Sequence, residues 1–274
     1  MVLAGGRSSR MGTPKAALEW HGSTLLRRTA GLISRVTGGP VVVARAAGQA
    51  LPALPPDVEV VDDPRDGQGP VQGIAAGLAA LAGRAEIAFV SSTDLPFLHP
   101  AFIRRVLRAV EEGIDVGLPV ARGYQQPLAA AYRTALAPIA ERLVKDGRLR
   151  PSFLFEECVV SRLDEAALRA DPVLAALDPG LDSVLNINEP ADYQAARARP
   201  APEVTVQRFG ALASGHRGPQ VVLSATVAGA AAAAGLALDG HVVAALNGDQ
   251  LTRDGETPLA AGDTVLFLSA DAGG

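Results

Sequence analysis

The sequence predicts an α/β domain with a mostly parallel sheet, followed by a smaller α+β domain. Three observations support this. From residue 1 to about 195, short apolar runs alternate with amphipathic stretches, as in folds that place helices on both faces of a parallel sheet. The run at 196–202 holds two prolines and two arginines, which favour an extended linker. Beyond it, polar and apolar residues alternate, as in half-buried strands.

Five runs in the first part are typical of buried strands, because they are short, apolar and bounded by Gly, Pro or Asp. They are Val2–Ala4, Val41–Ala44, Val58–Val61, Ile87–Ser91 and Val116–Val120. Between them, Pro70 and Pro100 each precede a run of helical periodicity, and proline is favoured at the first position of a helix. In such sheets, ligands bind beyond the carboxyl ends of the strands.

The last 72 residues predict a small α+β roll. Its elements are a strand around Val204 and Val206, an Ala-rich helix at about 226–235, a strand at His241–Leu246, a turn at Asn247-Gly248 and a final strand at Thr264–Leu268. We therefore expect domains at 1–195 and 203–274, joined by the linker 196–202.

Composition excludes several classes of function. The formal net charge is −4 and only 4% of residues are aromatic, which argues against nucleic-acid binding. The single cysteine, Cys158, excludes an internal disulfide framework and fits a reducing compartment. No signal peptide or membrane-spanning run is visible. We expect a cytoplasmic protein that binds neither nucleic acid nor membrane.

The N-terminal run Leu3–Lys15, LAGGRSSRMGTPK, has the composition of a phosphate cradle. Gly5 and Gly6 follow a predicted strand and let backbone N–H groups approach phosphate oxygens. Arg10 and Lys15 add positive charge. The spacing matches neither the P-loop nor the dinucleotide fingerprint.

This run resembles the signature of the molybdenum cofactor guanylyltransferase (MobA) family, which has adjacent glycines where related cytidylyltransferases more often have alanine in place of Gly5. Four further segments match the family in order: Gly67–Gly73, Thr93–Leu98, Gln126–Leu128 and Asn186–Pro190. The resemblance covers residues 1–195. It implies a Rossmann-like nucleotidyltransferase that uses Mg²⁺ to transfer GMP from GTP to molybdopterin, with release of pyrophosphate.

The resemblance also implies roles for individual residues. Lys15, Arg10 and Asp94 would be catalytic, and the nucleotide would be bound by Leu3, Ala4, Gly5, Gly6, Lys15, Asp63 and Asp94. Asp94 would be the Mg²⁺ ligand, unless it only caps the turn before Pro96. Asn188 would add an oxygen ligand or simply cap a helix. Either Asp62 or Asp63 would contact the nucleotide, and the alignment favours Asp63.

Two further expectations concern the acceptor and the base. Gln125, Gln126 and Tyr132 would face the acceptor phosphate, although core packing explains Tyr132 equally well. Ala44-Arg45 stands where the family often has asparagine after its second strand, which leaves base recognition open.

The first strand is short, because only Val2 precedes the Leu-Ala-Gly-Gly run. Either this strand is truncated or the natural start lies upstream. We expect upstream residues to raise the melting temperature.

The last part resembles the MoaD family of ubiquitin-like (β-grasp) sulfur carriers of molybdopterin synthase. The matching segments are Phe209–Ala213, Val243–Gly248, Leu259–Asp263 and Gly273-Gly274. The thiamine-pathway carrier is the alternative. The resemblance implies that the carboxylate of Gly274 is adenylated and converted to a thiocarboxylate. Its partners would be the large subunit of molybdopterin synthase and an adenylating enzyme.

Two other functions remain open from the sequence. The first domain could be a cytidylyltransferase of the same fold that acts on molybdopterin. Alternatively, the chain could be a carrier or scaffold whose first half binds nucleotide without turnover.

Overall fold

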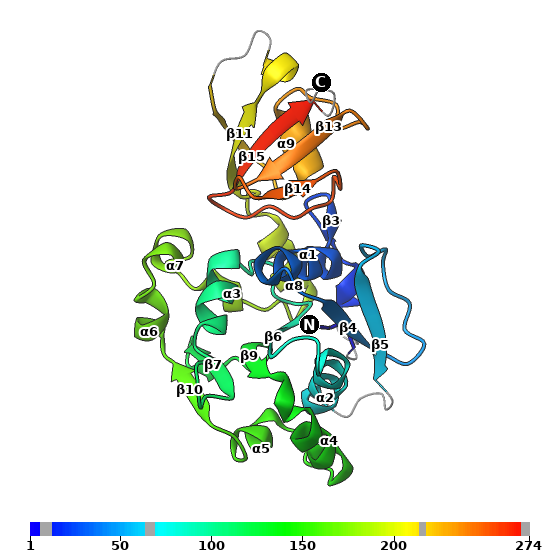
Figure 1. Ribbon diagram of the computed structural model, residues 1–274, viewed down its shortest axis with the longest axis vertical. Helices are drawn as coiled ribbons and strands as arrows, with labels where there is room; N and C mark the ends of the chain where they lie inside the picture. The colour runs from blue at the N-terminus through cyan, green and yellow to red at the C-terminus, as the bar shows by residue number, and fades with distance from the viewer. Residues whose placement is uncertain (6–12, 64–68, 214–217, 270–274) are drawn as a thin grey trace. The chain divides into compact units, whose positions relative to one another are not determined.

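The computed structural model describes residues 1–5, 13–63, 69–213 and 218–269 (Figure 1). Its contacts divide the chain into two compact units. The first unit comprises Met1–Leu18 and Leu25–Tyr193, and the second comprises Glu19–Thr24 and Gln194–Gly274. The main division falls close to residue 195. No sequence pattern indicated that the short segment Glu19–Thr24 groups with the second unit.

The first unit is built on a sheet of eight described strands in the order β10-β7-β9-β6-β1-β4-β5, with β8 paired to β7. The strands are β1 (Val2–Leu3), β4 (Val41–Ala46), β5 (Val58–Asp63), β6 (Ile87–Ser92), β7 (Val116–Ala121), β8 (Tyr124–Gln125), β9 (Ala129–Arg133) and β10 (Val160–Leu163). β5, β4, β1 and β6 are mutually parallel, whereas β9 is antiparallel to both β6 and β7. The predicted α/β fold with a mostly parallel sheet is confirmed.

Helices pack on both faces of this sheet, because alternate strand residues point to opposite sides. Val41 and Val43 belong to one apolar core, and Val42 and Ala44 belong to the other. The first core includes residues of α1 (Leu25–Thr37), α3 (Pro100–Leu107), α6 (Glu165–Arg169) and α7 (Pro172–Leu177). The second includes residues of α2 (Pro70–Leu81), α4 (Ala137–Lys145) and α5 (Pro151–Phe155).

Both proline-initiated helices form as predicted. Pro70 follows Gly69, whose φ of 81° is readily adopted only by glycine. Pro100 follows His99, whose Nδ1 accepts a hydrogen bond from Ala101 N at 3.1 Å and caps α3. The remaining short elements are η1 (Lys15–Ala17), η2 (Thr134–Leu136), η3 (Asp182–Val184) and α8 (Pro190–Arg197). The predicted linker 196–202 therefore begins inside the last turn of α8.

The second unit has a five-stranded sheet in the order β12-β11-β15-β13-β14. Its elements are β11 (Glu203–Arg208), η4 (Gly210–Ala213), β12 (Gln220–Leu223), α9 (Val227–Ala233), β13 (Val242–Leu246), β14 (Gln250–Thr252) and β15 (Thr264–Ser269). β11 and β15 are parallel, and the other neighbours are antiparallel. Residues of α9 share one apolar core with alternate residues of the sheet.

Turns in the second unit follow the sequence pattern. Asn247 and Gly248 have φ values of 51° and 87° and lie in the three-residue loop 247–249 that joins β13 to β14. A second hairpin joins β2 (Glu19–Trp20) to β3 (Ser23–Thr24). It contacts other residues of this unit, since Arg197 Nε lies 2.7 Å from Glu19 Oε2 and Ser23 Oγ donates to Glu256 Oε2 at 3.1 Å.

No helix in the described part of the chain is both long and apolar enough to cross a membrane.

Candidate functional site

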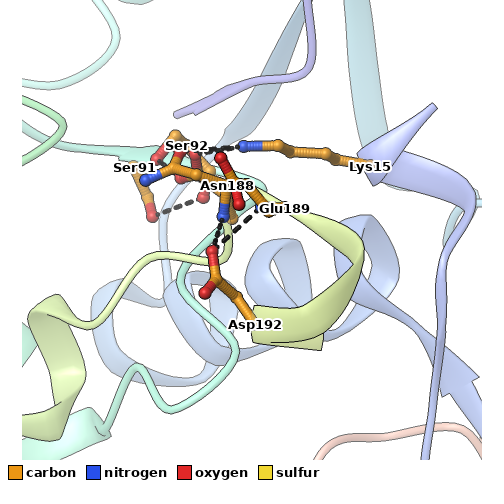
Figure 2. Close-up of polar contacts among 7 residues, drawn as sticks. Lys15, Ser91, Ser92, Asn188, Glu189 and Asp192 are labelled. Atoms are coloured by element: carbon orange, nitrogen blue, oxygen red, sulfur yellow. Dashed lines mark hydrogen bonds and ion pairs between the residues drawn. The ribbon is translucent and has the colours of Figure 1, made fainter. Parts of the chain in front are cut away.

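Three side chains from distant segments, Lys15, Asp94 and Asn188, meet beyond the carboxyl ends of β1 and β6. Figure 2 shows the Lys15 side chain reaching toward Asn188. Lys15 Nζ lies 3.0 Å from Asp94 Oδ2 and donates to Asn188 Oδ1 at 3.3 Å. The Lys15 and Asp94 side chains are each only 18% exposed, so this ion pair is partly shielded from water. Electrostatic interactions strengthen as water is excluded, so the position is well placed for chemistry on charged groups.

Asp94 is held from both its side chain and its backbone. It lies two residues after β6, whose last residue, Ser92, pairs with Leu3 of β1. The Ser92 hydroxyl donates to Asp94 Oδ1, and Asp94 O accepts a hydrogen bond from Ile187 N at 3.0 Å. The second bond joins the β6 end to the segment that carries Asn188. The carboxylate is therefore fixed in orientation by neighbours on two segments.

Asn188 is positioned by the start of α8. Asp192 Oδ2 accepts hydrogen bonds from Asn188 N and Glu189 N, each at 2.9 Å (Figure 2). This is one half of a capping box, in which a carboxylate in the first turn of a helix accepts from backbone N–H groups just before it. These two bonds, with the nearby charge of Lys15, lower the pKa of Asp192. Asn188 therefore lies beside Lys15 and just before α8, and its role as a metal ligand or as a helix cap stays a prediction.

The donor set suits a magnesium ion. Asp94 Oδ2 and Asn188 Oδ1 both point at a single cation, the Lys15 ammonium. Mg²⁺ prefers oxygen ligands and commonly takes one or two from the protein, with the rest from water and phosphates. Among the described residues there is no group of three or more His, Cys, Asp or Glu able to hold a metal. One carboxylate and one amide oxygen therefore fit a metal that shares its coordination with a substrate.

The predicted nucleotide cradle begins at the end of β1. The Leu3 side chain is buried, and Ala4 donates to Ala44 O at 2.8 Å and accepts from Gln49 Nε2 at 2.9 Å. The backbone of Ala4 is thus engaged with β4 and the loop after it. Gly5 is exposed, and a Cβ there would lie 3.2 Å from Ala46 N. A glycine at this point lets the chain leave the sheet against β4.

Two glycines of the segment Gly67–Gly73, Gly69 and Gly73, allow α2 to begin and to pack closely. A Cβ on Gly73 would lie 3.0 Å from Leu3 Cδ2, so this glycine allows α2 to approach β1 closely. Gly69 caps α2 in a left-handed conformation, and a Cβ there would lie 3.1 Å from Leu149 O. Both glycines orient the helix whose N-terminus follows the β5 end.

The two aspartates that end β5 lie at the same end of the parallel strands as Asp94, the carboxyl end. Asp62 Oδ1 is 2.7 Å from Arg45 Nε, and Arg45 also donates to Gln49 O at 3.0 Å. Asp63 pairs with Ala46 in the β4–β5 register. Arg45, at the position where the resembled family often has asparagine, is therefore occupied in an ion pair with Asp62.

Three predicted site residues, Gly6, Arg10 and Gly274, lie outside the described residues. Tyr132 is fully buried, its hydroxyl donates to Pro127 O at 2.8 Å, and burial raises its pKa. Of the two explanations for Tyr132, core packing is therefore the one that holds.

Sequence reasoning missed three residues that position the site. Ser92 orients Asp94, Asp192 holds the Asn188 turn, and Gln49 joins the Ala4 carbonyl to Ala46 N, which donates to Gln49 Oε1 at 3.1 Å. A signal existed only for Asp192, because an acidic residue two places after a proline at a helix start is typical of a capping contact. Hydroxyls and amides give no comparable pattern.

Comparisons with known proteins identify relatives of this chain. The model of the MobA-like NTP transferase domain matches residues 1–163. A molybdenum cofactor guanylyltransferase of Desulfosudis oleivorans is 32% identical over 199 residues, covering 72% of this chain and 93% of the relative. A probable molybdenum cofactor guanylyltransferase of Mycobacterium tuberculosis is 39% identical over 160 residues, covering 57% of this chain and 78% of the relative.

Among solved structures, the molybdopterin-guanine dinucleotide biosynthesis protein A of Archaeoglobus fulgidus has the same fold. The TM-score is 0.55 at 23% identity, and the match covers 72% of this chain and 95% of that one. The matched family model, the curated relatives and the site beyond β1 and β6 lead to one conclusion: the chain belongs to the family of MobA-like NTP transferases, and it is a nucleotidyltransferase.

Proposed function

We propose that the first unit transfers GMP from GTP to molybdenum-loaded molybdopterin. A phosphate oxygen of the acceptor attacks the α-phosphorus of GTP and forms a new P–O–P bond. The bond between the α- and β-phosphates breaks, and its electron pair leaves with pyrophosphate. The observation that carries the proposal is the convergence of Lys15, Asp94 and Asn188 beyond the ends of β1 and β6. The names of the relatives supply the choice of guanine and molybdopterin.

Charge on phosphate oxygens dominates this reaction, so catalysis is mainly positioning and electrostatic stabilisation. Lys15 brings a compact positive charge to the side-chain oxygens of Asp94 and Asn188. Ser92 and Ile187 N hold Asp94, and Asp192 holds Asn188. These two oxygen ligands would hold Mg²⁺, which when bound neutralises charge on the phosphates. Asp63 would contact the nucleotide from the β5 end, and Gly6 and Arg10 would complete the cradle.

The test is pyrophosphate release by the purified chain with Mg²⁺ and molybdenum-loaded molybdopterin, comparing GTP with CTP. Preference for GTP is the expected result. Preference for CTP would assign the chain to the cytidylyltransferases. No turnover with either would favour a scaffold that binds nucleotide. Omission of the acceptor is the control, because pyrophosphate released without it reports hydrolysis.

A second activity is proposed for residues 203–274 of the second unit, beyond the linker 196–202. The strand order β12-β11-β15-β13-β14, with β11 and β15 parallel, supports a ubiquitin-like roll covered by α9. We propose that this roll is a sulfur carrier of the MoaD type. The Gly274 carboxylate would be adenylated by a partner enzyme, and sulfur would then replace the adenylate to give a thiocarboxylate.

The large subunit of molybdopterin synthase would receive that sulfur. Mass spectrometry of the chain, incubated with an adenylating enzyme, ATP and a sulfur donor, tests this function. Replacement of one terminal oxygen by sulfur is expected. An unchanged mass would leave the second unit as a docking appendage.

A further inference from the structure

The turn between β7 and β8 holds a residue in an unfavourable backbone conformation. Arg122 has a φ of 55°, and Gly123 follows with a φ of 78°. A two-residue hairpin turn needs positive φ at both positions, and asparagine, aspartate or glycine normally supply it. A non-glycine side chain there is disfavoured, so other contacts must compensate.

Those contacts come from two distant segments. Arg122 N donates to Glu165 Oε1 at 2.8 Å. Its guanidinium donates to Gly180 O at 3.0 Å and to Asp182 Oδ1 at 2.9 Å. The hydrogen bond from Arg122 N is the main cause of a lowered pKa at Glu165. The turn is therefore anchored through both the backbone and the side chain of one strained residue.

The base of the hairpin is closed as well. Gln126 N donates to Pro119 O at 2.9 Å, and Gln126 Nε2 donates to Ala121 O at 3.2 Å and to Tyr124 O at 3.4 Å. The result is a rigid support for Tyr124, whose side chain is 75% exposed. A large aromatic side chain on a fixed and anchored turn is the arrangement that binding surfaces use, because little conformational entropy is lost on contact.

Two chain connections limit the distance between this hairpin and the segments that carry Asp94 and Asn188. Leu128, four residues after Tyr124, accepts a hydrogen bond from Ser92 N at 3.2 Å, so Tyr124 lies within about 14 Å of that carbonyl along the chain. Asp182, which anchors Arg122, lies six residues before Asn188. β7 also runs parallel to β6, because both are antiparallel to β9. The hairpin therefore follows the carboxyl end of β7, on the same side of the sheet as the carboxyl end of β6, which Asp94 follows.

We propose that the β7–β8 hairpin recognises the acceptor, and that Tyr124 stacks on its planar heterocycle. This inference rests on the proposed function, since it concerns the acceptor of the same reaction. Every planar heterocycle offers a π-face, and a tyrosine ring binds it by offset stacking. The cradle after β1 binds the nucleoside triphosphate, whereas the hairpin binds the other substrate. In the strand order of the sheet, β6, which Asp94 follows, lies between β1 and β7.

The decisive experiment is steady-state pyrophosphate release at saturating GTP with varied molybdenum-loaded molybdopterin. Tyr124→Ala should raise the KM for the acceptor about tenfold, a change of about 1.4 kcal/mol in binding. It should leave the KM for GTP and kcat close to their original values. Tyr124→Phe keeps the ring and should stay near the parent chain. Phe209→Ala, which removes an exposed aromatic ring from the second unit, is the matched control.

Asp182→Ala tests the anchor without touching Tyr124. It should raise the KM for the acceptor about threefold, and it should add little to Tyr124→Ala, because both changes act on the same contact. Equal KM values for the parent chain and Tyr124→Ala would overturn the inference, and so would a loss confined to kcat.

Failure of the proposed function gives a different result. If the parent chain shows no turnover with GTP, that function fails, and the hairpin is then tested by binding alone. Quenching of molybdopterin fluorescence by the parent chain and by Tyr124→Ala measures this binding. Weaker binding by the variant supports the inference, and equal binding overturns it.

Discussion

The two units place their proposed chemistry in different kinds of position. In the first unit, Lys15 meets Asp94 and Asn188, partners that are 79 and 173 positions away along the chain. In the second, the proposed reacting group is the terminal carboxylate of Gly274, which carries no side chain. A site assembled by tertiary contacts is sensitive to single substitutions around it. A reactive chain end depends instead on its own length and on a partner that admits it.

The largest effect is expected from deletion of Gly273 and Gly274, which tests whether the two proposed activities are separate. The deletion should abolish thiocarboxylate formation completely, because the adenylated carboxylate would then belong to a bulkier residue, Ala272. Guanylyl transfer should remain unchanged, since the transferase residues belong to the first unit. Mass spectrometry and pyrophosphate release on the same preparation measure both. A parallel loss of guanylyl transfer would contradict the separation of the two activities.

The reciprocal change is Asp94→Ala. Loss of the carboxylate should lower kcat for guanylyl transfer on the order of 10³-fold, because it removes the proposed metal ligand and the partner of the Lys15 charge. Thiocarboxylate formation at Gly274 should be unaffected. Asp146→Ala is the matched control, since Asp146 is an exposed aspartate of the first unit that ends α4 and belongs to none of the proposed site segments. If the two aspartate variants behaved alike, the assignment of Asp94 would be wrong.

Substitution of each lysine tests whether the charge of Lys15 has a specific role in the first unit. The chain has only two lysines, Lys15 and Lys145. Lys15→Met should lower kcat/KM for GTP about a hundredfold, because it removes the positive charge proposed to bind the phosphates from a partly shielded position. Lys145→Met, at the end of α4, should change it little. The ratio of the two kcat/KM values is the measurement, and a ratio near one would exclude a role for Lys15.

The smallest expected effect concerns the start of β1. The α-amino group of Met1 is buried and donates to Phe89 O at 2.6 Å, and burial lowers its pKa to about 5 from 8.0. Between these values the unfolded chain binds the proton more readily than the folded chain. The melting temperature of the 274-residue chain should therefore rise as pH increases from 5 to 8.

Adding a few apolar residues before Met1 is the matched test. It moves the amino group away from Phe89 O and lengthens a strand that has partners on both sides, β4 and β6. The extended chain should melt a few degrees higher, and the rise in melting temperature between pH 5 and 8 should shrink. An unchanged melting temperature on extension would count against a truncated strand.

Much of the architecture was predictable because local patterns carry it. Five predicted strands lie within two residues of their observed bounds, and Pro70 and Pro100 begin helices. The Asn247-Gly248 turn formed because both residues tolerate positive φ. β9 and β10 were missed. β9 is an Ala-rich strand, AAAYR, and alanine has weak strand propensity, so only its position between β6 and β7 makes it extended.

The sequence by itself determined which residue types are available for phosphate and metal chemistry, and it placed Lys15, Asp94 and Asn188 in recognisable segments. Only the tertiary structure decided that these three side chains meet. Parallel strands bring their carboxyl ends to one edge of the sheet, and the Asp94 O to Ile187 N hydrogen bond joins a third segment there. The strained Arg122 turn likewise depends on Glu165 and Asp182. Contacts between residues far apart in the chain leave no local pattern, because they are selected by packing of the whole fold.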